Sequence, residues 1–154
     1  MPRKQPFNII DAVLIVAIIG LSVLLVYIIW EPGQALAKME NYKWESRSRM
    51  NALRVAQQQY YGYKQTYTDD VDSLIIFMQD SIPKAVTDSV FTDFYQSPFG
   101  WDSLKRAPLS LQPYEIQIDD TSKVARYVIT DPDGFGYIGS LTDPDQHNRA
   151  SWEQ

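Results

Sequence analysis

The sequence has no cysteine and only one histidine, His147, and both absences limit its chemistry. Without cysteine the chain can form neither a disulfide framework nor a thiolate metal site. Because the one histidine lies in a polar C-terminal stretch, a Ser-His pair or a histidine metal centre is not expected. No glycine-rich phosphate loop follows a predicted strand. The sequence therefore predicts a protein that is not an enzyme.

Basic residues are too few to balance the acidic ones. The chain has 14 Lys and Arg against 19 Asp and Glu, which gives a formal net charge of −5. The first 30 residues carry Arg3, Lys4 and Asp11, a charge of +1, so the remainder carries −6. An acidic surface repels a phosphate backbone. We therefore expect no nucleic-acid partner.

Charge is almost absent from one long segment near the N-terminus. Residues 8–30, NIIDAVLIVAIIGLSVLLVYIIW, contain Asp11 and no other charged residue. A helix of this length rises about 1.5 Å per residue and crosses a hydrocarbon core about 30 Å thick. The alternative is a cleavable signal peptide with Ala35-Leu36-Ala37 as its cleavage site, but the apolar part of a signal peptide is typically about 7–15 residues long. The sequence predicts an uncleaved transmembrane helix in contact with the lipid bilayer.

The basic residues around this span favour one orientation. Arg3 and Lys4 lie close to its start, whereas the basic residues beyond it are more distant and are mixed with acids. Cytoplasmic flanks of membrane spans are enriched in Lys and Arg. We expect a single-pass protein, with residues 1–7 as a cytoplasmic tail and the C-terminal domain on the other side of the membrane.

Beyond the span, residues 31–67 show the spacing of an amphipathic helix. The apolar stripe comprises Leu36, Met39, Tyr42, Met50, Leu53, Ala56, Tyr60 and Tyr63. Ser46 is the weak point of that stripe. Steps of three and four residues are typical of one helix face. They predict a helical stem that continues the span, with a kink near Pro32, because proline removes a backbone hydrogen bond.

Residues 68–141 are predicted to form a small α+β domain. Thr68-Asp69-Asp70 is a helix-start signal, and the helix ends before Pro83. A turn-rich region follows, with an extended piece over residues 89–95. Short antiparallel strands are then expected over residues 114–119, 124–130 and 136–141, with a turn at residues 131–134. Residues 142–154 have no period and are predicted to be a polar tail.

These elements predict an α+β fold. A three-stranded meander with one apolar face needs a cover, and so does the apolar stripe of a long helix. The economical solution is a long N-terminal helix, consisting of the transmembrane part and its amphipathic extension, packed on a small C-terminal antiparallel sheet.

Two stretches of the helical region carry a family resemblance. The apolar run begins with Phe7-Asn8-Ile9-Ile10-Asp11 and continues with Ala17-Ile18-Ile19-Gly20, and the stem contains the stretch from Arg49 to Tyr61. Together with the order of elements, these stretches resemble type IV pilins and pseudopilins, whose membrane helix begins Phe-Thr-Leu-Ile-Glu. In that family a peptidase cuts between a glycine and the phenylalanine. Here Pro6 replaces that glycine, and Asp11 replaces the glutamate. The resemblance implies a non-catalytic structural subunit of a bacterial inner membrane, with its C-terminal domain on the periplasmic side. Pro6 implies that its N-terminus is not cleaved there.

Four residues of the span are candidate contacts with other helices. Asp11 is costly inside a membrane and is expected to pair with a basic group on a neighbouring helix, or else to reach water at the headgroups. Ala12, Ala17 and Gly20 are small enough to allow close helix approach. The expected partners are other transmembrane subunits or copies of this chain.

The C-terminal aspartates are a candidate calcium site, as in some pseudopilins, which hold calcium in a C-terminal loop. Ca²⁺ takes six to eight oxygen ligands, and Asp131, Asp133, Asp143 and Asp145 can supply them. Asp131-Pro132-Asp133-Gly134 is also a plain turn sequence. Apart from this Ca²⁺ site, no cofactor is expected.

Aromatic residues supply the remaining candidates. Tyr61 lies off the apolar stripe and is expected to contact a partner, because tyrosine is enriched at interfaces. Tyr60 and Tyr63 are expected to fill the core. Trp101 either anchors a partner or caps the fold.

The sequence thus predicts a pilin-like structural subunit that packs in the membrane and makes domain contacts outside it. One alternative is an accessory subunit of a large inner-membrane complex, whether secretion, respiratory or photosynthetic, with incidental pilin similarity. Another is a membrane-tethered domain that binds a ligand or an ion.

Overall fold

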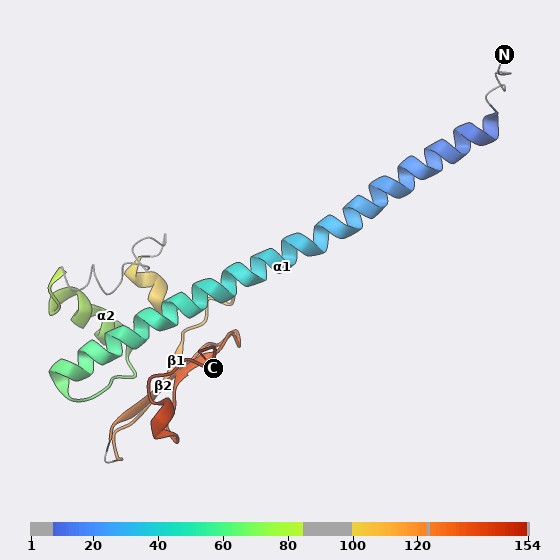
Figure 1. Cartoon of the computed structure of the whole chain (residues 1–154). Helices are drawn as coiled ribbons and strands as arrows, with labels where there is room; N and C mark the ends of the chain where they lie inside the picture. The colour runs from blue at the N-terminus through green and yellow to red at the C-terminus, as the bar shows by residue number, and fades with distance from the viewer. Residues whose placement is uncertain (1–7, 85–99, 123, 154) are drawn as a thin grey trace. The chain divides into compact units, whose positions relative to one another are not determined.

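The fold is α+β, as the sequence predicts, with a long N-terminal helix and a small antiparallel sheet (Figure 1). The computed structural model describes residues 8–84, 100–122 and 124–153, and the side chains of residues 29–33 are not included. The chain divides into two units, residues 1–41 and residues 42–154. The extended piece expected over residues 89–95 lies outside the described residues.

Helix α1 runs from Ile9 to Lys64, a length of 56 residues. It belongs to both units, and its helical backbone continues through Pro32. The kink expected at Pro32 remains a prediction. In the second unit α1 buries Met50, Leu53 and Ala56, so the central part of the predicted stripe is confirmed. Leu36 and Met39 of the first unit are exposed.

Helix α2 spans Val71–Asp80 and begins where the sequence signal predicts. Asp70 is its N-cap, and the Asp70 side chain accepts a hydrogen bond from the Asp72 amide at 3.0 Å. A capping side chain replaces one of the hydrogen bonds that the first turn of a helix lacks. Leu74 and Met78 of α2 are buried, and the 3-10 helix η1, Trp101–Lys105, adds the buried Leu104.

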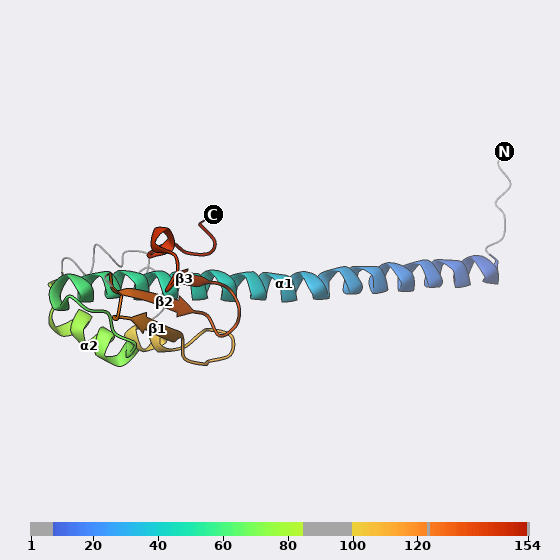
Figure 2. The same cartoon turned by 90° about the horizontal axis from the view of Figure 1, so that it is seen from below.

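Three short strands form the sheet in the order β1-β2-β3. Strand β1 is Glu115–Asp119, β2 is Arg126–Thr130 and β3 is Tyr137–Gly139, and both pairings are antiparallel. Residues alternate between the two faces of a strand. The inner face is therefore a set of apolar side chains: Ile116, Tyr127, Ile129 and Ile138. Within the second unit, the sheet covers one side of α1, while α2 and η1 lie on another side (Figures 1 and 2).

The segment predicted as a polar tail is folded onto the sheet. It contains the 3-10 helix η2, Pro144–Gln146, and a bridge between Ala150 and Ile138 of β3. The Gly139 amide donates to the Arg149 carbonyl at 3.0 Å, and the Ser151 amide donates to the Tyr137 carbonyl at 2.9 Å. Ala150 is 2% exposed. Backbone pairing rather than apolar periodicity holds this segment, which is why the sequence pattern does not indicate it.

Candidate functional site

The first unit contains a helix segment, Ile9–Ile28, that is long and apolar enough to cross a membrane. Its large apolar side chains are all exposed within the chain itself. A signal sequence near an N-terminus can meet the same criteria of length and apolar composition, so this test alone does not separate an anchor from a signal.

Asp11 has a partner inside its own helix. Its carboxylate accepts a hydrogen bond from the Asn8 amide at 3.3 Å, and the Asn8 carbonyl accepts from the Asp11 amide at 2.9 Å. This is the returning half of a capping box, in which an acid at the third helical position satisfies the N-cap amide. Asp11 thus stabilises the start of α1. Its pairing with a second helix remains a prediction.

The small residues of the span have no contact that requires them. A Cβ added to Gly20 would meet no atom within 4 Å. Ala17 is exposed and Ala12 is half-buried. Close approach of another helix at Ala12, Ala17 and Gly20 remains a prediction.

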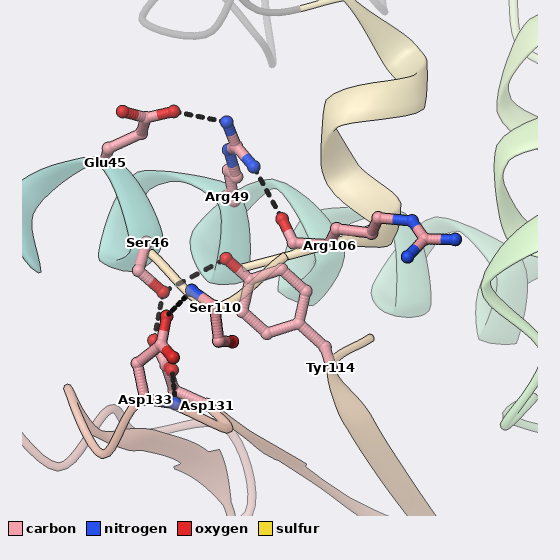
Figure 3. Close-up of polar contacts among 8 residues, drawn as sticks. All are labelled: Glu45, Ser46, Arg49, Arg106, Ser110, Tyr114, Asp131 and Asp133. Carbon is pink, nitrogen blue, oxygen red and sulfur yellow. Dashed lines mark hydrogen bonds and ion pairs between the residues drawn. The ribbon is translucent and has the colours of Figure 1, made fainter. Parts of the chain in front are cut away.

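The most unusual chemistry lies in the second unit, where polar side chains are buried against α1 (Figure 3). We call Ser46, Tyr114 and Asp131 the buried polar cluster. Ser46 is fully buried, Tyr114 is 4% exposed and Asp131 is 3% exposed. They come from α1, from the residue before β1, and from the turn between β2 and β3. The cluster therefore joins segments that are far apart in sequence.

The hydrogen bonds in the cluster have a defined order of donors, from Tyr114 to Ser46 and from Ser46 to Asp131. The Ser46 hydroxyl donates to the Asp131 carboxylate, and the Tyr114 hydroxyl lies 3.0 Å from the Ser46 oxygen. A serine hydroxyl has a single proton. Since that proton goes to the carboxylate, Tyr114 is the donor to Ser46. The side-chain oxygens of Ser46, Tyr114 and Asp131 are thereby all hydrogen-bonded, and an unsatisfied polar group in a low dielectric would be costly.

The turn between β2 and β3 holds Asp131 in position. The second carboxylate oxygen of Asp131 accepts from the Asp133 amide at 2.5 Å, and the Asp131 amide donates to the Gly136 carbonyl at 3.1 Å. Asp133 accepts from the Ser110 amide at 3.2 Å and so connects this turn to the loop before β1. The turn predicted from the sequence is present, and both of its acids bind backbone amides.

Arg49 is buried beside the cluster, one helical turn after Glu45. Its guanidinium donates to the Arg106 carbonyl at 2.5 Å and forms an ion pair with Glu45. Burial raises the pKa of Tyr114, and the charge of Arg49 acts in the opposite direction. Tyr114 is therefore a neutral donor at physiological pH.

The geometry of the cluster fits a structural role. A nucleophilic serine needs a base and access to a substrate. Ser46 has no access to solvent, and its partner is a carboxylate that already accepts a backbone amide. The arrangement fixes α1 against two loops. Only Ser46 gives a signal in the sequence, as a polar residue on an apolar stripe.

Three of the four aspartates of the predicted calcium site have separate side-chain partners. Asp131 and Asp133 bind the amides described above, and Asp143 caps η2 by accepting from the Asp145 amide at 3.0 Å. Among the described residues, no three His, Asp or Glu side chains are grouped so that they could hold a metal ion. The geometry gives the calcium prediction no support.

The predicted aromatic contacts lie against their own chain. Tyr61 is half-buried and stacks on Tyr67 with ring centroids 4.6 Å apart. Tyr63, expected in the core, is 61% exposed and touches Phe77 of α2 only by its edge. Tyr60 is half-buried and contacts the same Phe77 at 5.0 Å.

Trp101 packs against the core from η1. It also lines a groove of about 570 Å³ between α2 and η1, together with Ile75, Ile76, Asp72 and Lys105.

A second polar contact involves the only histidine. The Tyr67 hydroxyl and His147 Nε2 are 2.9 Å apart, and the Tyr67 ring also contacts Tyr127 of β2. Burial lowers the pKa of His147, and Arg126 acts in the same direction. No sequence pattern predicts this contact, because His147 lies in a segment without a period.

Searches of protein-family models, curated proteins and solved structures find no match to this chain.

Proposed function

We propose that this chain is a non-catalytic, single-span structural subunit of a membrane-associated assembly, of the pilin or pseudopilin type. Its N-terminus lies in the cytoplasm and its folded domain on the periplasmic side of a bacterial inner membrane. The membrane helix packs against other spans, and the domain contacts partners outside.

The observation that carries this proposal is the division of α1 into two environments. Over Ile9–Ile28 its large apolar side chains are exposed, whereas Met50 and Leu53 are fully buried in the domain. Leaving a large apolar side chain in water instead of burying it costs about 1.5–3 kcal/mol. A lipid environment removes that cost for the first segment, and the domain core removes it for the second.

Two features support a structural role rather than a catalytic one. The buried polar cluster binds α1 to its domain and gives no access to a substrate. Asp11, the acid of the pilin-like motif, already has a role in starting the helix. Pro6 in place of the family's glycine supports a subunit that keeps its N-terminus.

Membrane insertion is tested with a charge placed in the span. Leu21 and Leu111 have similar exposed fractions, 67% and 62%, but only Leu21 lies in the proposed span. Leu21→Arg is expected to cost about 2.5–3.5 kcal/mol of insertion free energy and to reduce the carbonate-resistant membrane fraction. The matched control, Leu111→Arg, is expected to remain in the membrane. If the two variants keep equal carbonate-resistant membrane fractions, the proposal is contradicted.

Mass spectrometry of the N-terminus and reporter fusions test the anchor and its orientation. An intact N-terminal segment and an active periplasmic reporter at the C-terminus are expected. A soluble chain beginning after Ala37 identifies a signal peptide instead. A methylated Phe7 at the N-terminus indicates ordinary pilin processing. Purification in a mild detergent then identifies the other subunits and separates a pilin-type assembly from another membrane complex.

A further inference from the structure

Strand β1 is at one edge of the sheet, and the two edges differ in how they are covered. Figure 2 shows β2 between β1 and β3. The β3 edge is covered by residues 149–151 through the bridge of Ile138 to Ala150. Within residues 8–84, 100–122 and 124–153, β2 is the only strand that pairs with β1. The β1 edge is therefore the side on which the sheet can be extended.

The backbone of β1 is suited to such an extension. It pairs with β2 without a bulge from Glu115 to Asp119. In an antiparallel pair, alternate residues direct their N–H and C=O groups away from the neighbouring strand. Such groups bind an added extended chain through main-chain hydrogen bonds.

The charges along β1 indicate which chain fits. Glu115 and Asp120 are exposed, and Asp119 lies between them in sequence. Asp119 accepts from the Thr121 amide at 3.0 Å and from the Ser122 hydroxyl at 2.6 Å. Hydrogen bonds from Ser122 and Thr121 lower the pKa of Asp119 to about 2, so this acid is ionised at neutral pH.

Arg126 is opposite Asp119 in the register, but its guanidinium donates elsewhere, to the Leu141 carbonyl at 2.8 Å and to the Thr142 carbonyl at 3.3 Å. Residues 115–122 themselves contain three acids and no basic residue.

A second copy of the chain fits this edge poorly. An antiparallel pair of two β1 strands centred on Gln117 would place Glu115 opposite Asp119 of the second copy, and the reverse. Like charges directly opposite each other destabilise a strand pair. In an added strand with alternating Lys or Arg residues, basic side chains would lie opposite these acids, because both sets alternate with the same period. Opposite charges in such positions stabilise a strand pair.

We propose that β1 is a docking edge for an extended, Lys- or Arg-rich segment of a partner protein, which adds to the sheet as a fourth strand. This inference rests on the proposed function in one respect, because the proposed function is what assigns contacts with partner proteins to the domain. It is independent of membrane insertion, so the peptide titration below and the Leu21→Arg assay fail separately.

The test uses the full chain in non-ionic detergent micelles at low salt. The probe is a capped peptide in which Lys and Val alternate over seven residues. Amide resonances of residues 115–119 are expected to shift and their hydrogen exchange to slow on titration. A peptide of the same composition with proline at its centre is expected not to produce these changes, because proline cannot donate to the ladder.

Charge reversal tests the electrostatic part. Glu115→Lys is expected to raise the dissociation constant of the peptide about three- to tenfold, the range that a cross-strand charge pair allows. Asp145→Lys is the matched control, because Asp145 is also an exposed acid but lies on η2. When both titrations are repeated at about 0.15 M salt, Asp145→Lys is expected to leave the dissociation constant within about twofold, because salt screens a distant surface charge.

Three results overturn the proposal. In the first, both charge reversals weaken the peptide equally, which shows only general attraction to an acidic protein. In the second, the peptide with central proline binds as well as the alternating one. In the third, the amides of β1 shift with protein concentration in the absence of peptide, which identifies a second copy as the occupant.

Discussion

At the scale of single residues, Ser46 determines how α1 meets the domain. A serine on an apolar stripe is unfavourable unless its hydroxyl is satisfied. Here it accepts from Tyr114 and donates to Asp131, so one hydroxyl serves two buried partners. The same residue that weakens the stripe in the sequence therefore fixes the register of α1 against two loops.

Replacing Ser46 should therefore be costly. Ser46→Ala leaves both the Tyr114 hydroxyl and an Asp131 oxygen without a partner, and each unsatisfied buried group costs about 1–3 kcal/mol. The free energy of unfolding, measured by urea denaturation in non-ionic micelles, is expected to fall by about 2–4 kcal/mol, because the side chains around the two unsatisfied groups relax partly. Ser48→Ala on the same helix is the control and should change it by no more than about 0.5 kcal/mol. Equal losses in both variants would show that the cluster contributes nothing.

His147 gives the stability a dependence on pH. Its pKa in the folded chain is lowered from 6.5 by burial, with Arg126 acting in the same direction. Between the folded pKa and the unfolded one, the unfolded chain binds a proton that the folded chain does not. Stability is therefore expected to be lost as the pH falls below 6.5. The urea midpoint of His147→Gln should change less between neutral and mildly acidic pH than that of the unaltered chain. An equal change in the two proteins would contradict this assignment.

At the scale of elements, α1 is one helix with two kinds of surface. Helix propensity and the capping of its start by Asp11 form the element locally. The two parts of α1 differ in what surrounds them, because the sheet and α2 pack on α1 within the second unit. Among the side chains that the structure describes, the buried ones lie in the second unit, so Leu36 and Met39 share the spacing of the buried residues but not their burial.

Two glycines of different elements should respond in opposite directions to alanine. Gly139 in β3 has φ +87°, and an added Cβ would lie 2.3 Å from the Tyr127 carbonyl oxygen. Gly139→Ala is expected to lower the free energy of unfolding by more than about 3 kcal/mol, because steric strain adds to an unfavourable φ.

Gly62 is inside α1 with open space around it, so Gly62→Ala should raise the free energy of unfolding by about 0.5–1 kcal/mol. Thermal unfolding of the two variants measures both, and a harmless Gly139→Ala would exclude the described packing of β3.

At the scale of the whole molecule, the two units have different solvent requirements. All residues of the hydrophobic core belong to the unit of residues 42–154, and the apolar span belongs to the other unit. A chain of residues 42–154 is therefore expected to be soluble without detergent and to unfold cooperatively, as small single domains do. Calorimetry and size-exclusion chromatography check this. A fragment that aggregates or lacks a transition would show that the first unit is needed for folding.

The sequence determined the elements and their type by local patterns. An apolar run with a single charged residue predicted the span candidate, three- and four-residue steps predicted the helix, and alternation with turn residues predicted the three strands. The helix start at Asp70 and the turn at residues 131–134 followed from capping and turn chemistry alone. These features depend on neighbours in the chain, so they are visible without a fold.

Only the tertiary structure decided which polar and aromatic groups meet. The pairing of Ser46 with Asp131 joins residues 85 positions apart, and that of Tyr67 with His147 joins residues 80 positions apart. No period in the sequence encodes such contacts, because they depend on how the loops return to α1. The same reason explains why the tail was predicted as free and Tyr63 as buried. A residue's spacing fixes its helix face, but the position of the neighbouring element decides whether that face is covered.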